Sequence, residues 1–171
     1  MPITWRRVAM LAAIMLLLGI GLTEHVRADG GGDDDERAKV PRATPADPDY
    51  EAAVRAIKLD KFAEAIPLLK RVVDRDPRNA DAFNWLAYAT RRTGDPAASI
   101  PIYQKALAID PKHRGAHEYI GEAYLMLGNV AKAKEHLARL NSLCFLPCSE
   151  YTDLRKALER YEKTGKVSAT H

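Results

Sequence analysis

The sequence predicts an all-α fold in which a pair of helices is repeated along the chain. Pro77 and Pro111 lie 34 residues apart, each after an aspartate, and Gly94 and Gly128 have the same separation. Within each period, apolar residues lie at helical spacing on both sides of a turn. A fixed period of this length is typical of stacked helical units, in which each unit buries the apolar face of its neighbour.

The ends of the helices follow from the residues between them. Gly94 lies between two apolar stripes and can take the left-handed conformation that ends a helix. Asp60 holds the corresponding place one period earlier, at some steric cost. Asp110 precedes a proline, which pushes its backbone away from helical angles and ends the next helix. The period therefore predicts three two-helix units, at 46–79, 80–113 and 114–143.

The last unit needs a cover for its apolar face, and residues 144–164 can provide it. They comprise a loop with two cysteines and then a helix, for which Ser149 or Thr152 is a candidate cap. The apolar stripe of this helix consists of Tyr151, Leu154, Leu158 and Tyr161. We therefore expect seven helices in total, followed by a disordered tail at 165–171.

The N-terminal part predicts export. Residues 1–28 have a basic start at Arg6 and Arg7, an uncharged apolar run at 8–22 and a cleavage site ending at Ala28. Cleavage is favoured over retention as an anchor because the run is shorter than a membrane span. Residues 29–45 are rich in Gly, Pro and acids and predict a disordered linker. The expected location is the bacterial periplasm, with no stable membrane anchor after cleavage.

Composition argues against several classes of function. The chain carries a net charge of +3, but its first 28 residues hold three arginines and one acid, so the rest has 23 basic and 22 acidic residues. That balance gives no support to nucleic-acid binding. No metalloprotease, hydrolase or phosphate-loop motif is present, so we expect neither enzymatic activity nor a cofactor.

The repeated pattern resembles the tetratricopeptide repeat (TPR) family from residue 46 to about residue 143. The middle unit matches best, and the family positions it keeps are Leu86, Ala87, Gly94, Tyr103, Ala106 and Pro111. Small residues at Ala53, Ala87 and Gly121 correspond to the places where the first helix of a unit closely approaches the second. The resemblance implies a right-handed superhelix whose first helices line an inner groove.

The family uses this groove to hold peptides or partner helices, so the resemblance implies a protein-interaction scaffold or adaptor. The residues expected to project into the groove are Tyr50, Lys58, Asn84, Tyr88, Arg91, Arg92, Glu118, Glu122 and Met126. They form a basic central band and an acidic end, which suit a partner with an apolar stripe and an acidic segment. Self-association is left open, because three repeats expose apolar edges.

Some relatives grip a C-terminal carboxylate with a lysine and asparagines on this face. Those places are taken here by Tyr50, Val54, Trp85, Gly115 and Tyr119. The clamp is absent, so the sequence argues against recognition of chaperone tails.

Cys144 and Cys148 enclose a three-residue spacer and can form a disulfide in an oxidising compartment. The alternative function is a periplasmic copper or thiol-handling protein that uses this pair. A soft metal would need a third ligand, and His136 lies too far along a continuous helix to supply one. His113 and His117 are expected as ordinary surface histidines, and no metal site is predicted.

Overall fold

The computed structural model describes residues 47–166, so the predicted signal peptide, the linker and most of the predicted tail lie outside the described residues. Within 47–166 the chain forms seven helices and no strand, which confirms the all-α prediction. The helices are α1 (Pro48–Lys58), α2 (Phe62–Arg75), α3 (Ala80–Arg92), α4 (Pro96–Ile109), α5 (Arg114–Met126), α6 (Val130–Leu143) and α7 (Ser149–Thr164). None of the helices in this range is long and apolar enough to cross a membrane.

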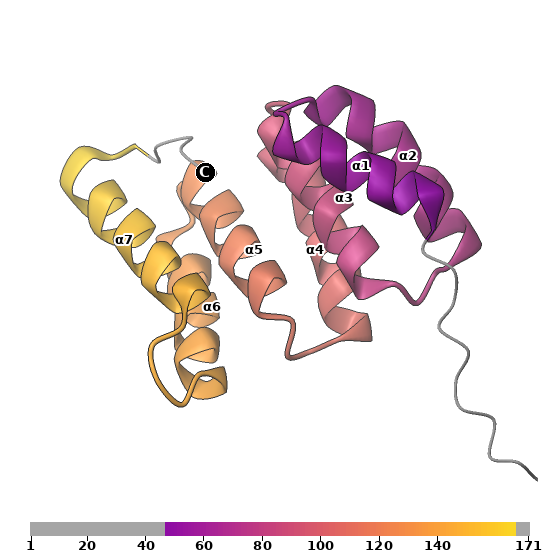
Figure 1. The fold of residues 1–171 in the computed structure, drawn as a ribbon. Helices are drawn as coiled ribbons and strands as arrows, with labels where there is room; N and C mark the ends of the chain where they lie inside the picture. The colour runs from indigo at the N-terminus through magenta and orange to yellow at the C-terminus, as the bar shows by residue number, and fades with distance from the viewer. Residues whose placement is uncertain (1–46, 167–171) are drawn as a thin grey trace, which may run out of the picture. The chain divides into compact units, whose positions relative to one another are not determined.

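The helices pack as consecutive pairs. Helix α1 packs on α2, α3 on α4 and α5 on α6, and each pair also contacts the next through α2 with α3 and α4 with α5 (Figure 1). Helix α7 packs against both α5 and α6, in the place that a further unit would occupy. The structure therefore contains the predicted capping helix.

The turns inside the units have the chemistry that the sequence predicted. Gly94 and Gly128 have φ angles of 99° and 76°, and Asp60 has a φ of 57°. Asp60 is the one non-glycine residue of the described chain with a positive φ. An aspartate tolerates this conformation better than most residues, yet it does so at a steric cost that glycine avoids.

Short polar side chains begin most of the helices. Asn79 accepts a hydrogen bond from the backbone N–H of Ala82 at 2.9 Å, and Asp95 accepts one from Ala98 at 2.8 Å. His113 does the same for α5, since its Nδ1 accepts from the N–H of Ala116 at 3.1 Å. These caps satisfy backbone donors that a helix leaves free at its start.

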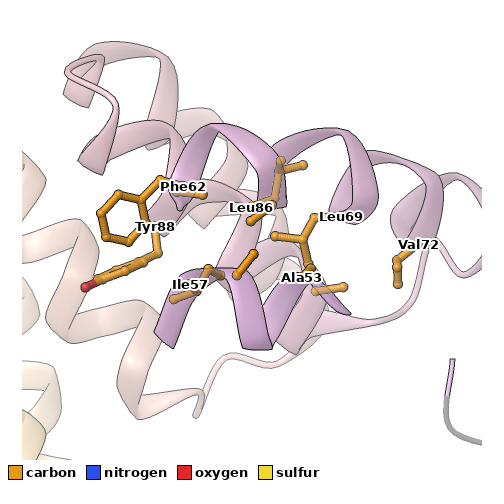
Figure 2. Close-up of a cluster of buried hydrophobic side chains, with 11 residues drawn as sticks. Ala53, Ile57, Phe62, Leu69, Val72, Leu86 and Tyr88 are labelled. Carbon is orange, nitrogen blue, oxygen red and sulfur yellow. The ribbon is translucent and has the colours of Figure 1, made fainter. Parts of the chain in front are cut away.

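The core is a series of apolar clusters between adjacent helices. Figure 2 shows the first one, in which Ala53 and Ile57 of α1 face Leu69 and Val72 of α2, with Leu86 of α3 beside them. Close approach depends on small residues, so the alanines at the crossing points are fully buried. Those fully buried alanines are Ala53, Ala65, Ala87 and Ala133.

The cap of α7 differs from the prediction. Cys148 occupies the N-cap position and makes no side-chain capping bond. Ser149 is already the first helical residue, and its hydroxyl bonds the Glu150 carboxylate at 3.1 Å, so the expectation of a Ser149 or Thr152 cap is wrong.

Gly121 also has a role that the repeat pattern did not predict. A Cβ placed on it would lie 2.6 Å from Cδ2 of Leu154, a fully buried residue of α7. The glycine therefore allows the capping helix to approach α5 closely. The expected close approach to the second helix of its own unit stays a prediction.

Candidate functional site

A pocket of about 400 Å³ lies where α3, the start of α5 and the start of α7 come together. Three helices that are distant in sequence each contribute to its walls. The lining residues are Asp81, Asn84, Trp85, His113, Gly115, Glu118, Tyr119, Ser149, Glu150 and Asp153.

Aromatic rings form one wall of this pocket. Trp85 of α3 and Tyr119 of α5 are half-buried, with ring centroids 6.5 Å apart. Behind them, the ring of Tyr88 lies 4.9 Å from that of Tyr119 and 5.6 Å from that of Trp85. Such a cluster offers flat apolar surface and negative ring faces to a ligand.

Four carboxylates make the pocket strongly acidic. Two of them have partners at the rim, because Asp81 lies 3.1 Å from Nε2 of His113 and Glu150 lies 3.4 Å from Nε of Arg114. Asp153 has a weak pair with Lys156, at 3.6 Å. The fourth, Glu118, makes no hydrogen bond or ion pair with any residue of the described chain, although it is only 6% exposed.

The environment of Glu118 favours its neutral form. Burial is the largest cause that raises the pKa of this carboxyl, and together with the negative charges of Glu122, Asp153 and Glu150 it brings the pKa to about 8. The guanidinium of Arg91 acts in the opposite direction but does not offset them. A buried carboxyl with no partner in the described chain is costly to ionise, and a cation beside it would reduce that cost.

Asn84 is the second buried polar group without a partner here. Its side chain is 4% exposed, and its Oδ1 makes no hydrogen bond within the described structure. Buried amide oxygens are almost always bonded in proteins, which makes this one a candidate acceptor for a ligand.

The predicted basic band is largely closed off. Arg91 forms an ion pair with Glu122 at 2.8 Å, and both side chains are almost fully buried. Arg92 is bonded to the hydroxyl of Tyr88 at 2.6 Å, and its guanidinium lies over the ring of Phe62, 4.3 Å from the centroid. The two arginines are therefore engaged within the protein, and the expectation that they form an open basic surface is corrected. Glu122 of α5 pairs with Arg91, and the rings of Phe62 and Tyr88 cover Arg92.

The residues predicted for the groove are thus distributed over different environments. Asn84 and Glu118 line the pocket, whereas Lys58 and Met126 are exposed and lie outside its lining. The buried members of the set are Asn84, Tyr88, Arg91, Glu118 and Glu122, and the partly buried ones are Tyr50 and Arg92. Contact with a partner stays a prediction for every residue of the set.

Much of the pocket wall is not among the residues predicted from the sequence. Asp81, Glu150 and Asp153 are absent from the predicted set, and Trp85 and Tyr119 enter it only as replacements for the clamp residues. The spacing of Asp81, Asn84 and Trp85 places them on one helical face and could have indicated this wall. Nothing local in the sequence indicates that the first turn of α7 forms part of this pocket wall.

His113 and His117 lie four residues apart in the sequence but have different partners in the structure. His113 bonds Asp81, whereas His117 lies with its Nδ1 2.9 Å from Nδ1 of His136. The Nε2 of His117 donates to the carbonyl of Pro111 at 3.1 Å, so its Nδ1 must accept from His136 in the neutral pair. His117 is buried, which corrects the expectation of a surface histidine.

In the structure Cys144 and Cys148 form a disulfide-bonded pair, with their Cα atoms 5.9 Å apart. Phe145 and Leu146 inside this small loop are highly exposed. In the part of the chain that the structure describes, no group of three His, Cys, Asp or Glu side chains could hold a metal ion. Whether the pair is structural or active in thiol or copper chemistry stays a prediction.

Comparison with known proteins agrees with this architecture. Two family profiles, both described as tetratricopeptide repeat, match residues 50–114 and 90–143. Protein FlbA of Caulobacter vibrioides is 38% identical over 61 residues, which cover 36% of this chain and 10% of FlbA. The chain therefore spans only a small part of that relative.

Solved structures show the same fold. The first TPR domain of human RPAP3 has a TM-score of 0.61 at 23% identity, over 68% of this chain and 91% of that one. The first TPR of Spaghetti (RPAP3), bound to the HSP90 peptide SRMEEVD, has a TM-score of 0.59 at 24% identity, over 67% and 92%. MamA from Desulfovibrio magneticus RS-1 has a TM-score of 0.54 at 25% identity, over 56% and 54%. With its 34-residue period, its paired helices and both matching profiles, the chain belongs to the tetratricopeptide repeat family.

Proposed function

We propose that this protein is an exported interaction scaffold that binds a segment of another protein across α3, α5 and α7. The observation that carries the proposal is the pocket of about 400 Å³, which combines aromatic walls with two buried polar groups, Asn84 and Glu118, that have no partner among residues 47–166. A folded domain rarely leaves such groups unpaired unless something else contacts them.

The comparison with RPAP3 supports a peptide or helix as the partner. That protein was solved with the HSP90 peptide SRMEEVD, in which three of the last four residues are acidic. The pocket here is lined by four acids of its own, among them Glu118 and Asp153, and would repel such a sequence. We therefore propose a shared mode of binding and a partner of different charge.

Export to the bacterial periplasm is the second part of the proposal. It is supported by the basic and apolar pattern of residues 1–28 and by the spacing of Cys144 and Cys148, which suits a disulfide in an oxidising compartment. Cell fractionation followed by N-terminal sequencing tests it. A mature protein that begins at residue 29 is expected, and an intact leader in the cytoplasmic fraction would overturn export.

Site-specific photo-crosslinking in living cells tests the scaffold. A photoreactive residue at Asp81, at the exposed edge of the pocket, should capture one dominant protein. The matched control is Gln104, an exposed position of α4 outside the pocket, which should capture nothing in common with it. No adduct at Asp81, or the same adducts at both positions, would overturn binding at this face.

A further inference from the structure

We propose that the pocket between α3, α5 and α7 receives a single arginine side chain of the partner, with Glu118 as the carboxylate that pairs with it. The inference rests on the proposed function and adds to it the chemical identity of the group that is recognised.

Two unpartnered acceptors in one pocket carry the argument. Glu118 is 6% exposed and Oδ1 of Asn84 is fully buried, and neither has a partner in the described chain. They come from α5 and α3, so their convergence on the same pocket is a product of tertiary packing. Both are acceptors when Glu118 is ionised, and the ligand that satisfies them must therefore be a donor.

The charges around the pocket specify a cation. The groups that face Glu118 are Glu122 on its own helix, Asp153 and Glu150 on α7, and Arg91 on α3. Arg91 is already bonded to Glu122, so it cannot compensate both carboxylates. The surplus of negative charge is consistent with the raised pKa of Glu118, and a bound cation would return that carboxyl to its ionised form.

The acceptors and aromatic rings that line the pocket favour arginine over lysine. The guanidinium is planar and has five N–H donors, so it can serve a carboxylate and an amide oxygen together while it stacks on an aromatic ring. Trp85 and Tyr119 provide such rings in the pocket wall. The ring of Tyr119 already has one such contact inside the protein, because the guanidinium of Arg91 lies over it, 5.6 Å from the ring centroid.

Nuclear magnetic resonance titration tests the chemistry directly. The probes are N-acetyl-arginine methylamide and its citrulline counterpart, which has nearly the same shape but no charge. We expect saturable shifts at the amides of Gly115 and Tyr119 and at the Trp85 indole with the arginine probe only. Equal shifts with citrulline, or none at these residues with arginine, would overturn the proposal.

Two variants locate the binding. Glu118→Gln keeps the size of the side chain and should weaken binding of the arginine probe about tenfold or more. Gly115→Leu should block the pocket without strain in the backbone, because a Cβ there lies 3.5 Å or more from its neighbours. The matched control is Glu159→Gln, an exposed acid of α7, which should leave binding unchanged. Unaltered affinity in Glu118→Gln would overturn the assignment.

The same variants separate this inference from the scaffold proposal. When the photo-crosslinked partner is lost in Gly115→Leu and in Glu118→Gln, both proposals stand. A partner lost in Gly115→Leu but retained in Glu118→Gln would overturn the arginine and leave the scaffold standing. Binding of the arginine probe without any cellular partner would support the pocket's chemistry and overturn the scaffold.

Discussion

Arg91 of α3 and Glu122 of α5 form an ion pair at 2.8 Å in which both side chains are almost completely removed from solvent. The guanidinium also lies 5.3 Å from the centre of the Tyr88 ring, beside the buried hydroxyl of Tyr103. The pair joins the first helices of two adjacent units, at a place where the repeat pattern suggested an open basic groove. A buried pair of this kind is costly to break, because removal of one partner leaves the other charge unpaired.

Replacing one member of the pair should therefore destabilise the fold strongly. We expect Glu122→Ala to lower the free energy of unfolding by about 3 to 5 kcal/mol, and Arg91→Met/Glu122→Leu to cost much less. Urea denaturation followed by circular dichroism measures both. Charge reversal at Arg91 consequently reports on folding rather than on partner binding. Similar losses in the single and double variants would show that the pair is not coupled.

Glu118 should make the protein less stable as the pH rises. Its pKa is raised from 4.5 to about 8 in the folded state, so the folded protein holds a proton that the unfolded chain has lost between these values. The contribution of Glu118 to the unfolding free energy should fall from pH 4.5 to pH 8, and Glu118→Gln should remove this contribution from the profile. At pH 8 the variant should be more stable by on the order of 2 kcal/mol.

Urea titrations of both proteins at pH 5 and pH 8 provide the measurement. A variant that is less stable than the parent at pH 8 would contradict the argument. A variant that is more stable yet unable to bind the arginine probe would identify Glu118 as a residue kept for binding.

The His117–His136 pair should make the fold sensitive to acid. Burial, the larger cause, and the proximity of His117 together lower the pKa of His136 to about 4. Burial also lowers the pKa of His117. Both favour the neutral form in the folded state, so their contribution to stability is complete above about pH 6.5 and is lost as the pH falls towards 4. His136→Phe should flatten this part of the profile, as measured by thermal unfolding between pH 7 and pH 4.5; an unchanged slope would exclude the pair as its source.

Asp60 offers a stabilising change at a turn. Its φ of 57° is unfavourable for any residue with a Cβ. Its ion pair with Arg92, at 3.5 Å, contributes little in return, because the Asp60 side chain is exposed to solvent. Asp60→Gly should raise the unfolding free energy by about 1 kcal/mol through relief of this conformation. Gly94→Ala, at the equivalent turn with a φ of 99°, should lower it by about as much. Thermal unfolding of both variants checks the two predictions, and a change of the unfolding temperature in the same direction in both variants would contradict them.

The cysteine pair should contribute modestly to stability. Closure of so short a loop between Cys144 and Cys148 stabilises the fold by about 2 kcal/mol through the entropy of the unfolded chain. Cys144→Ser/Cys148→Ser should show this loss in urea, and reduction of the parent protein should match it. Titration of free thiols in the unreduced protein is the accompanying check, because two reactive thiols would favour the thiol or copper alternative.

The sequence by itself determined the repeating helices and their turns. Helical spacing of apolar residues and the turn positions at Asp60, Gly94 and Gly128 act over a few residues, so these features can be recognised without knowledge of the packing. The same holds for the covering helix at Ser149–Thr164, whose apolar stripe indicated that one face is buried.

Only the tertiary structure decided which polar side chains are buried, paired or left open. Arg91 and Glu122 lie 31 residues apart, and either could face solvent on an isolated helix. Because of the first turn of α7, Glu118 lies in a pocket with Asp153, with no partner in the described part of the chain. The cost of burying a charge depends on neighbours from several helices, and helix periodicity contains no information about which neighbours those are.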